Sequence, residues 1–444
     1  MCAVTQRREP CAMTLPPGRR SLLLALPAAL AATFTARTTA QAMTTSGTNH
    51  WAQSSAAGTT IGESQWTAGT PTAPGPTVAK ELLRQLPGSM AGPELVVSNN
   101  PETVTGPGWL MQHARTTANR GGRARALSGT FPLYLYHQNS TGGTAYLHVL
   151  ASNPGSSAVT VSARGSAWTN ADKPLVQNPA QRAGTGPCHA VSADWAAGNL
   201  RAYLSPTSVA PKKVVQVARI PMTGSILDGL FEITASGGVY TYTVITTDGS
   251  LTTAVNLSQT DSAAAPGNII GQTETTYGRE AGVYGGSRWT TGRTTIDVPA
   301  AGKHLGLALN TTVRQVAALD QTAPATAALG DSSQRSWGNY GARYSVELAL
   351  RNPGTQPRTA RLVFGSNVTG STDVPGNTWN GAMAVSVDGA APRIQTAYVR
   401  PTAPRDTIGT YTVPAGATRT VTLDFVVPGL ITAGSQLLLE SVTG

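Results

Sequence analysis

Two segments of the chain share one pattern, and this pattern constrains the fold more than any other feature of the sequence. The first segment is AYLHVLASNPGSSAVTVSARGS, around Asn153-Pro154-Gly155, and the second is YSVELALRNPGTQPRTARLVFGS, around Asn352-Pro353-Gly354. Apolar residues alternate with other residues on both sides of each Asn-Pro-Gly, which predicts strands with one buried face. Proline fixes φ, and glycine accepts a left-handed conformation. We therefore expect each segment to form a β-hairpin that turns at its Asn-Pro-Gly.

Alignment of the two segments predicts which side chains face the core. One set of positions is apolar in both copies and is expected inside: Leu147, Val149 and Ala151 in the first copy, and Val346, Leu348 and Leu350 in the second. The alternate positions are expected in solvent: His148 and Ser152 in the first copy, and Glu347 and Arg351 in the second. Each copy is followed by a further proline-flanked strand, at 213–220 and 420–427. The repeat thus indicates two similar domains.

The chain from about residue 80 onward consists of short alternating runs broken by Gly, Pro and Asn, a pattern typical of many short antiparallel strands. We expect an all-β protein with two immunoglobulin-like β-sandwich domains, at 96–262 and 263–444. Internal duplication would explain their similarity, and a single large sandwich or barrel is the alternative. The only helix predicted is a turn or two at 80–85, stopped by Pro87-Gly88.

The first 42 residues have the pattern of an export signal. Basic residues at Arg19-Arg20 precede a short apolar run at 22–34, and small residues follow up to Ala42. The arginine pair resembles the twin-arginine signal, and the run is too short to span a bilayer. The protein is therefore expected in the periplasm, cell envelope or extracellular space, with no membrane span after cleavage. Residues 43–95, rich in Ser, Thr, Gly and Pro towards their start, are expected to form a disordered tether and a short lead-in.

Charge and cysteine content narrow the partners and the source of stability. The formal net charge of +10 includes five arginines and one glutamate within residues 1–42, so the mature chain keeps +6. These charges are spread along the chain rather than clustered with aromatic residues, which argues against nucleic-acid binding. Cys2 and Cys11 precede the signal, and Met13 is an alternative start. Cys188 is then the sole mature cysteine, and an intramolecular disulfide is excluded.

Three glycine-rich segments resemble a known family. They are 86–102, which begins Leu-Pro-Gly and ends Ser-Asn-Asn-Pro-Glu, 282–289 (Gly-Val-Tyr-Gly-Gly-Ser-Arg-Trp) and 338–341 (Gly-Asn-Tyr-Gly). In this order and spacing they resemble an uncharacterised family of exported cyanobacterial proteins that is known only as a domain of unknown function. The resemblance covers about residues 80–444. It implies an exported location and a broad architecture, and it transfers no activity and no site residue.

The sequence contains no recognisable catalytic or metal-binding motif. The six histidines form no zinc-binding pair, although His137 and His148 could face one another across strands as part of a cross-strand aromatic cluster or a metal site. Cys188 and His189, ahead of Asp194 and Trp195, suggest a reactive thiol. The simpler interpretation is a buried cysteine without a chemical role. Carboxylate pairs such as Asp228 with Glu232, or Glu274 with Glu280, are not distinguished from surface carboxylates. We predict no cofactor and no metal.

Aromatic residues give the clearest hint of binding. Eight Trp and twelve Tyr against five Phe favour rings with a polar group, which stack on sugars or anchor protein partners. Four of them lie in loop-like contexts and are the predicted ligand-binding residues: Trp289, Trp337, Tyr340 and Trp379. The alternative is that each fills the edge of a core.

Three functions remain open from the sequence. The first is a non-catalytic exported protein that binds or organises cell-envelope polysaccharide. The second is a glycan-active hydrolase whose carboxylate pair is not identified. The third is a scaffold that binds another exported protein by strand addition or through a tryptophan-anchored loop.

Overall fold

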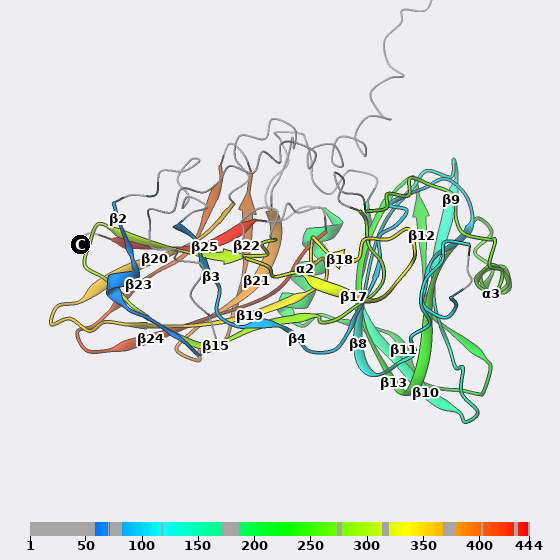
Figure 1. Cartoon of the computed structure of the whole chain (residues 1–444), viewed down its shortest axis with the longest axis horizontal. Helices are drawn as coiled ribbons and strands as arrows, with labels where there is room; N and C mark the ends of the chain where they lie inside the picture. Colours follow the sequence, from blue (N-terminus) through cyan, green and yellow to red (C-terminus); the bar gives the residue numbers. More distant parts are fainter. Residues whose placement is uncertain are drawn as a thin grey trace, which may run out of the picture.

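The structure is a computed structural model, and it describes residues 58–69, 71, 82–116, 119–170, 186–272, 278–312, 319–366, 379–400, 403–429 and 434–442. The predicted export signal at 1–42 lies outside the described residues, as does the first part of the predicted tether. Strands make up most of the described chain, as predicted, and they form two β-sandwich lobes that lie side by side (Figure 1).

The first lobe is built from twelve described strands in two layers. They are β5 (Leu95–Ser98), β6 (Thr103–Val104), β7 (Gly108–Gln112), β8 (Leu127–Asn139), β9 (Thr144–Ser152), β10 (Val159–Asn170), β11 (Arg201–Val209), β12 (Val214–Thr223), β13 (Ile226–Thr246), β14 (Ala281–Tyr284), β17 (Ala323–Ala328) and β18 (Arg335–Ser336). The long strand β13 belongs to both layers. Its first half pairs with β8 and β10, and its second half pairs with β7 and β9. The register with β8 shifts between Ala235 and Val239, where two glycines let the strand bend.

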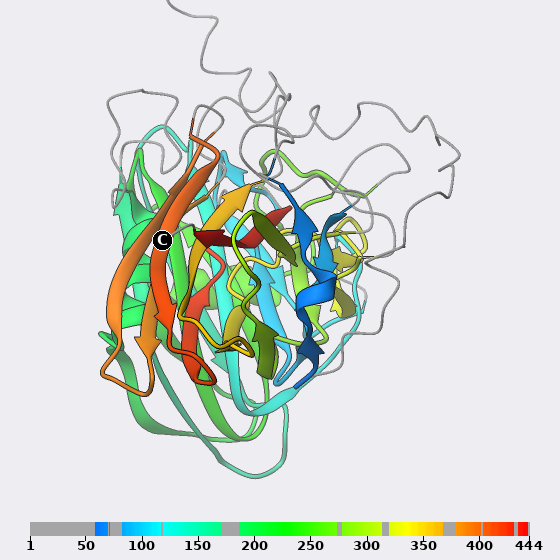
Figure 2. The ribbon, with the colours of Figure 1, turned by 90° about the vertical axis from the view of Figure 1, so that its left-hand side faces the viewer.

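The second lobe is a sandwich of two separate sheets. Sheet 2 contains β1 (Thr60–Ile61), β4 (Ser89–Ala91), β15 (Arg288–Asp297), β19 (Arg343–Arg351), β21 (Trp379–Val387), β22 (Arg393–Val399) and β24 (Thr418–Val426). Sheet 3 contains β2 (Thr67–Ala68), β3 (Arg84–Gln85), β16 (Lys303–Leu309), β20 (Arg358–Ser366), β23 (Arg405–Val413) and β25 (Ser435–Val442). Large apolar and aromatic side chains fill the space between these two sheets. Figure 2 looks onto this lobe, with the first lobe behind it.

The division of the chain between the lobes differs from the predicted boundaries in two places. The short strands β1–β4, within the predicted tether and lead-in, pair with strands of the second lobe. Strands β14, β17 and β18, within the predicted second domain, continue the first lobe's sheet through the pairing of β14 with β5. The chain therefore crosses between the lobes several times, because strand pairing joins segments that are distant in sequence.

The predicted repeat is present, but neither copy is a hairpin. Strands β9 and β10 lie in opposite layers of the first lobe, and β19 and β20 lie in opposite sheets of the second. In both lobes the strand that follows the Asn-Pro-Gly has an equivalent partner: β10 pairs with β11, and β20 pairs with β23. The strand that precedes the Asn-Pro-Gly pairs with the strand that comes next in the chain after this partner: β9 pairs with β12, and β19 pairs with β24. The prediction of similar sandwiches is confirmed, and that of hairpins is wrong.

The burial of side chains confirms the residues predicted to face the core and corrects one residue predicted to face solvent. All six residues predicted inside are buried in the two cores. His148 was expected in solvent and is instead fully buried, with its ring nitrogens 3.2 Å from Gln216 Oε1 and 3.1 Å from Thr246 Oγ1. Polar side chains on flanking strands thus cover this part of the outer face.

The asparagine of each Asn-Pro-Gly explains how the chain arches between the layers. Asn153 is 1% exposed, and its Nδ2 donates hydrogen bonds to the carbonyl oxygens of Ser157 at 2.8 Å and Val209 at 2.9 Å. Its Oδ1 accepts from the backbone N–H of Gly155 at 2.9 Å. One side chain therefore satisfies two backbone groups within the turn and one at the end of β11, and it so joins the arch to a neighbouring strand.

Asn352 makes the same three bonds in the second lobe. Its Nδ2 donates to the carbonyl oxygens of Gln356 at 2.8 Å and Val413 at 2.9 Å, and its Oδ1 accepts from the N–H of Gly354 at 2.9 Å. The two lobes thus share both their strand pairing and the side-chain bonds of the arch. This agreement supports internal duplication.

The helices correct a further expectation. Residues 80 and 81 of the predicted turn at 80–85 lie outside the described residues. Leu82 has 3₁₀ geometry, and Arg84–Gln85 is the strand β3 rather than part of a helix. The described residues contain the helices α2 (Pro187–Ala197) and α3 (Leu251–Gln259) and a 3₁₀ turn at Glu63–Gln65. None of these helices is long and apolar enough to cross a membrane. Helix α3 flanks the first lobe, and α2 lies between the two lobes (Figure 1).

Helix α2 ties the lobes together through side chains on two faces. Towards the second lobe, Ser192 Oγ accepts from the N–H of Ala382 on β21 at 2.9 Å. Towards the first lobe, Trp195 Nε1 donates to the carbonyl of Leu230 on β13 at 3.2 Å. A junction cluster of buried side chains surrounds the helix: Leu95, Val97, Tyr134, Tyr136, Cys188, Val191, Ile226, Leu230, Tyr284, Ala323, Ala342 and Val426. The junction is therefore packed like a core.

Candidate functional site

Two of the four predicted ligand-binding aromatics lie in the core of the second lobe. Trp289 is 2% exposed and stacks on Tyr344, and Trp379 is 1% exposed and packs against Phe364 and Phe425. Neither ring reaches a surface on which a sugar could stack, so these two predictions are corrected. Both residues begin or nearly begin strands, and strand alternation points their rings inward.

The other two predicted aromatics lie beside the lobe junction and are partly exposed. Tyr340 stacks on Tyr134 with ring centroids 6.0 Å apart. Trp337 follows β18, and the guanidinium of Arg335 lies over its ring at 5.9 Å from the centroid. The structure thus separates the four residues into a core pair and a junction pair rather than gathering them on one face.

The most exposed tryptophan of the described chain is not among the four predicted residues. Trp168, on β10, is 50% exposed, and its Nε1 donates to Asp194 Oδ2 on α2 at 2.8 Å. Ser166 Oγ donates to the same carboxylate oxygen at 2.6 Å. The ring is thus held in one orientation on the outer face. The signal was present in the sequence, because Val161 and Ala163 point inward and Trp168 falls on the opposite phase of that strand.

The nucleophile and metal candidates are not assembled for chemistry. His137 lies on β8 between Ser98 Oγ and the Pro101 carbonyl, both at 2.8 Å. It does not face His148, which lies in the other layer on β9, a strand that pairs with β12 and β13 and not with β8. Cys188 is 2% exposed, and burial beside Asp228 raises the pKa of its thiol well above the ordinary value. Among the described residues, no three metal-ligating side chains gather into a possible site.

Two carboxylates are buried at or beside the lobe junction. Asp228 is 1% exposed, and Tyr134 Oη donates to its Oδ2 at 3.4 Å. Glu280 is 2% exposed and accepts from Ser336 Oγ at 3.2 Å and from the N–H of Gly338 at 3.3 Å. Burial raises the pKa of each carboxyl to about 7. Both groups are enclosed, and their suggested partners are elsewhere: Glu232 pairs with Arg164 on the surface, and Glu274 lies outside the described residues.

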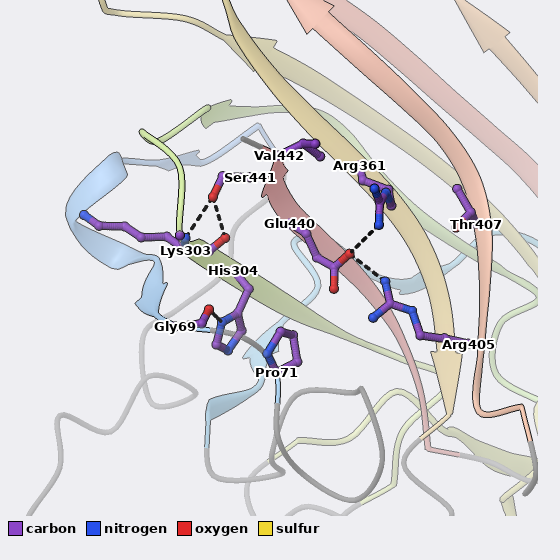
Figure 3. A pocket seen from close by; sticks show the side chains of 11 residues that line it. Gly69, Pro71, Lys303, His304, Arg361, Arg405, Thr407, Glu440, Ser441 and Val442 are labelled. Carbon is purple, nitrogen blue, oxygen red and sulfur yellow. Dashed lines mark hydrogen bonds and ion pairs between the residues drawn. The ribbon is translucent and has the colours of Figure 1, made fainter. Parts of the chain in front are cut away.

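A pocket of about 490 Å³ lies on the outer face of sheet 3 (Figure 3). Three of its side chains form a row across adjacent strands, with His304 on β16 opposite Glu440 on β25, and Glu440 opposite Arg361 on β20. Directly opposed residues have Cβ atoms about 4.5–5.5 Å apart. The residue after His304 and those beside Arg361 and Glu440 pack into the core, which fixes the row on the outer face: Leu305, Leu362 and Leu439.

Glu440 is held between two guanidinium groups. Its Oε2 lies 2.6 Å from Nη2 of Arg405 on β23, a charge-assisted hydrogen bond, and 3.8 Å from Nη1 of Arg361, which is beyond hydrogen-bond range. Figure 3 shows both arginines pointing towards this carboxylate. The Arg361 side chain is 41% exposed. Arg405 therefore neutralises Glu440 most closely, and Arg361 remains accessible to a ligand.

His304 presents a hydrogen-bond acceptor at the pocket. It is 3% exposed, and its Nδ1 lies 2.8 Å from the carbonyl oxygen of Gly69. Because a carbonyl only accepts, Nδ1 carries the proton in this bond, and Nε2 of the neutral ring is an acceptor. Nε2 is buried and has no hydrogen-bond partner among the described residues. A buried acceptor without a partner costs about 1–3 kcal/mol, so a ligand hydroxyl bound there would remove a cost.

The described lining of the pocket offers groups that can bind a polar ligand. It combines arginine donors, an imidazole acceptor and one carboxylate that is already paired with arginine. Glycoside hydrolysis in its common forms requires two carboxyl groups across the scissile bond, and the described lining supplies one. The row spans strands more than fifty residues apart in sequence, which is why no local motif marked it.

Fold and site together define an all-β protein of two similar sandwiches with a polar pocket on an outer sheet face. The chain belongs to the family described as "Protein of unknown function (DUF3370)", whose match covers residues 81–440. This confirms the resemblance to a domain of unknown function. No curated protein matches.

The solved structures that match the chain include a tandem of two domains. It is the N-terminal CBM22-1–CBM22-2 tandem domain of Xyn10C from Paenibacillus barcinonensis, with 10% sequence identity over 77% of this chain and 92% of that one. The TM-score is 0.14, so the superposition supports no inference about function.

Proposed function

We propose that this chain is an exported, non-catalytic β-sandwich protein that binds or organises cell-envelope polysaccharide. The observation that carries the proposal is the pocket on sheet 3, where Arg361, Glu440 and His304 meet in one cross-strand row. Export is supported by the basic, apolar and small-residue pattern of residues 1–42.

The chemistry of the row favours a hydroxylated ligand. A sugar ring offers several hydroxyl groups, each of which both donates and accepts hydrogen bonds. Arg361 supplies donors, and the Nε2 of His304 supplies an acceptor that lacks a protein partner. An apolar ligand would leave these groups desolvated without compensation, at a cost in free energy.

The first test is binding of the purified mature chain, residues 43–444, to envelope polysaccharide and to peptidoglycan from its own source, with released sugars assayed in parallel. Saturable binding without sugar release is the expected result. Release of sugars would replace the proposal with a glycan hydrolase. Failure to bind either polymer, with retention of an exported protein in a pull-down from the same envelope, would replace it with a scaffold.

The location of the site is tested by substitution in the same assay. Arg361→Ala should weaken binding at least about tenfold, which corresponds to 1.4 kcal/mol and lies within the range for a charged hydrogen bond. Arg419→Ala is the matched control, because Arg419 lies on sheet 2 of the same lobe, pairs with Asp388 and has a similarly exposed side chain at 38%. Trp168→Ala tests the exposed ring of the other lobe and should leave binding unchanged. Equal losses in all three variants would contradict the assignment.

A further inference from the structure

We infer that the pocket on sheet 3 selects acidic glycans, with Arg361 binding the anionic group of a sugar and His304 accepting a hydrogen bond from a neighbouring hydroxyl. The inference rests on the proposed function and narrows its ligand to sugars that carry a carboxylate or another oxyacid group. Three features of the pocket carry it: its charge, the geometry of its two arginines and the acceptor nitrogen of its histidine.

The charge of the described lining is positive. The described lining contains Lys303, Arg361 and Arg405 and a single carboxylate, Glu440, so the basic side chains exceed the acidic one by two positive charges. The Lys303 ammonium extends away from the Arg–Glu row in Figure 3, so it contributes to the field around the pocket rather than to a direct contact. A neutral glycan would gain nothing from this excess, whereas an acidic one is attracted by it.

The two arginines differ in how closely they approach Glu440. Arg405 is bound to Oε2 of Glu440 at 2.6 Å, while Nη1 of Arg361 remains 3.8 Å from the same oxygen. The guanidinium group is planar and presents paired N–H donors that match an oxyacid anion. Glu440 thus holds the arginine pair at the pocket, and Arg361 offers its donors to a ligand anion. The negative charge of Glu440 is largely compensated by Arg405 and does not reverse the attraction.

His304 distinguishes a sugar from a simple anion. Its Nδ1 is committed to the Gly69 carbonyl, so Nε2 accepts and requires a donor. A fully ionised inorganic sulfate has no hydroxyl to donate, whereas an acidic sugar carries ring hydroxyls beside its anionic group. The site therefore has a complementary group for each part of an acidic sugar, and inorganic sulfate matches only one of them.

The test compares four ligands by titration calorimetry on the mature chain: an oligogalacturonate, its fully methyl-esterified form, a sulfated dextran and inorganic sulfate. The ester keeps the ring and its hydroxyls and loses only the charge. We expect the oligogalacturonate to bind at least tenfold more tightly than the ester, and inorganic sulfate to bind more weakly than either polymer that carries anions. Added salt should weaken binding of the acidic ligands and leave that of the ester nearly unchanged.

Variants connect the selectivity to the pocket. Arg361→Ala should bring the affinities for the acid and the ester together, and Arg361→Lys should restore part of the difference, because it keeps the charge without the planar fork. Arg419→Ala should leave the ratio unchanged. Thermal melting of each variant confirms that it folds, and Arg361 is exposed enough for its replacement to be tolerated.

The outcomes separate this inference from the proposed function. Equal or tighter binding of the ester would overturn the acidic selectivity and leave glycan binding in place. Absence of binding to every glycan by a folded protein would overturn both. Equal binding of galacturonate and sulfated dextran would support the shared oxyacid chemistry, whereas a preference for inorganic sulfate over both would overturn the role given to His304.

Discussion

At the scale of single residues, the side chains of Asn153 and Asn352 hold the arch between the two layers of each lobe. Each is buried in its arch and bonds to three backbone groups, two of them in the turn and one at the end of a neighbouring strand. Alanine at either position would leave one buried carbonyl group, that of Val209 or Val413, without a partner, together with a carbonyl and an N–H of the turn. Unsatisfied buried groups cost about 1–3 kcal/mol each, and water at the turn replaces some of the lost bonds.

We expect Asn153→Ala to lower the free energy of unfolding by about 2–3 kcal/mol in urea denaturation, and Asn352→Ala to do the same. Asp at either position keeps the acceptor and loses both donors, so it should restore little stability. Asn256→Ala, at an exposed position on α3, is the control and should change stability by less than about 0.5 kcal/mol. A strong effect at one asparagine and none at the other would contradict the equivalence of the two arches.

At the scale of elements, the loop that follows β24 closes the lobe junction. A Cβ atom at Gly429 would lie 2.4 Å from Tyr134 Oη, 2.6 Å from Asp228 Oδ2 and 2.9 Å from Cys188 Sγ. Those three side chains are buried and come from β8, β13 and α2 of the first lobe's side. The backbone at Gly429 thus packs directly on them, and no side chain fits between.

Gly429→Ala should therefore destabilise the protein by about 1–3 kcal/mol through overpacking of the junction. Gly143→Ala is the matched control, because a Cβ there would have no heavy atom within 4 Å. Differential scanning calorimetry measures both variants. A separate unfolding transition for each lobe in Gly429→Ala would show that the junction couples the lobes, whereas an unchanged melting temperature would contradict the tight packing.

At the scale of the whole molecule, the buried carboxyls make stability depend on pH. Burial raises the pKa of Asp228 and Glu280 to about 7 from ordinary values of 3.8 and 4.5. Between about pH 4 and 7 the folded state holds these protons more tightly than the unfolded chain. Their contribution to the free energy of unfolding is therefore present in full at low pH and is lost as pH rises to 7, by about 1.4 kcal/mol per pH unit for each group.

Two buried histidines oppose this trend at lower pH. Burial lowers the pKa of His113 and His137 to about 4, so their contribution is present above about pH 6.5 and is lost as pH falls towards 4. The two trends offset one another between pH 4 and 6.5. Above that range only the carboxyl contribution changes.

Asp228→Asn and Glu280→Gln should remove this carboxyl contribution. We expect the melting temperature of each variant, relative to the wild type, to be higher at pH 8 than at pH 5, because the wild type must ionise a buried acid and the variant need not. Glu232→Gln, which replaces a partly exposed carboxylate paired with Arg164, is the control and should show little difference between the two pH values. Equal shifts at pH 5 and pH 8 for the junction variants would contradict the raised pKa values.

Helix α2 and the exposed Trp168 were not predicted, although the sequence contains local signals for both. Helix α2 begins with proline at its first turn and ends at Gly198 with φ of 72°, both of which are ordinary marks of helix ends. Its larger apolar residues, Cys188, Val191 and Trp195, repeat at helical spacing and pack in or against the junction cluster, which is a further local signal. Trp168 likewise falls on the outward phase of a strand whose Val161 and Ala163 are buried.

The sequence by itself determined the strand content, the inward face of the repeated strands and the two-sandwich organisation, because strand alternation and turn residues act within a few positions of one another. Only the tertiary structure decided that the Asn-Pro-Gly segments arch between layers, that Trp289 and Trp379 lie in a core, and that His304, Glu440 and Arg361 meet. Each of these depends on which distant strand pairs with which and in what register. A one-residue change in that register would turn the whole row to the other face of the sheet.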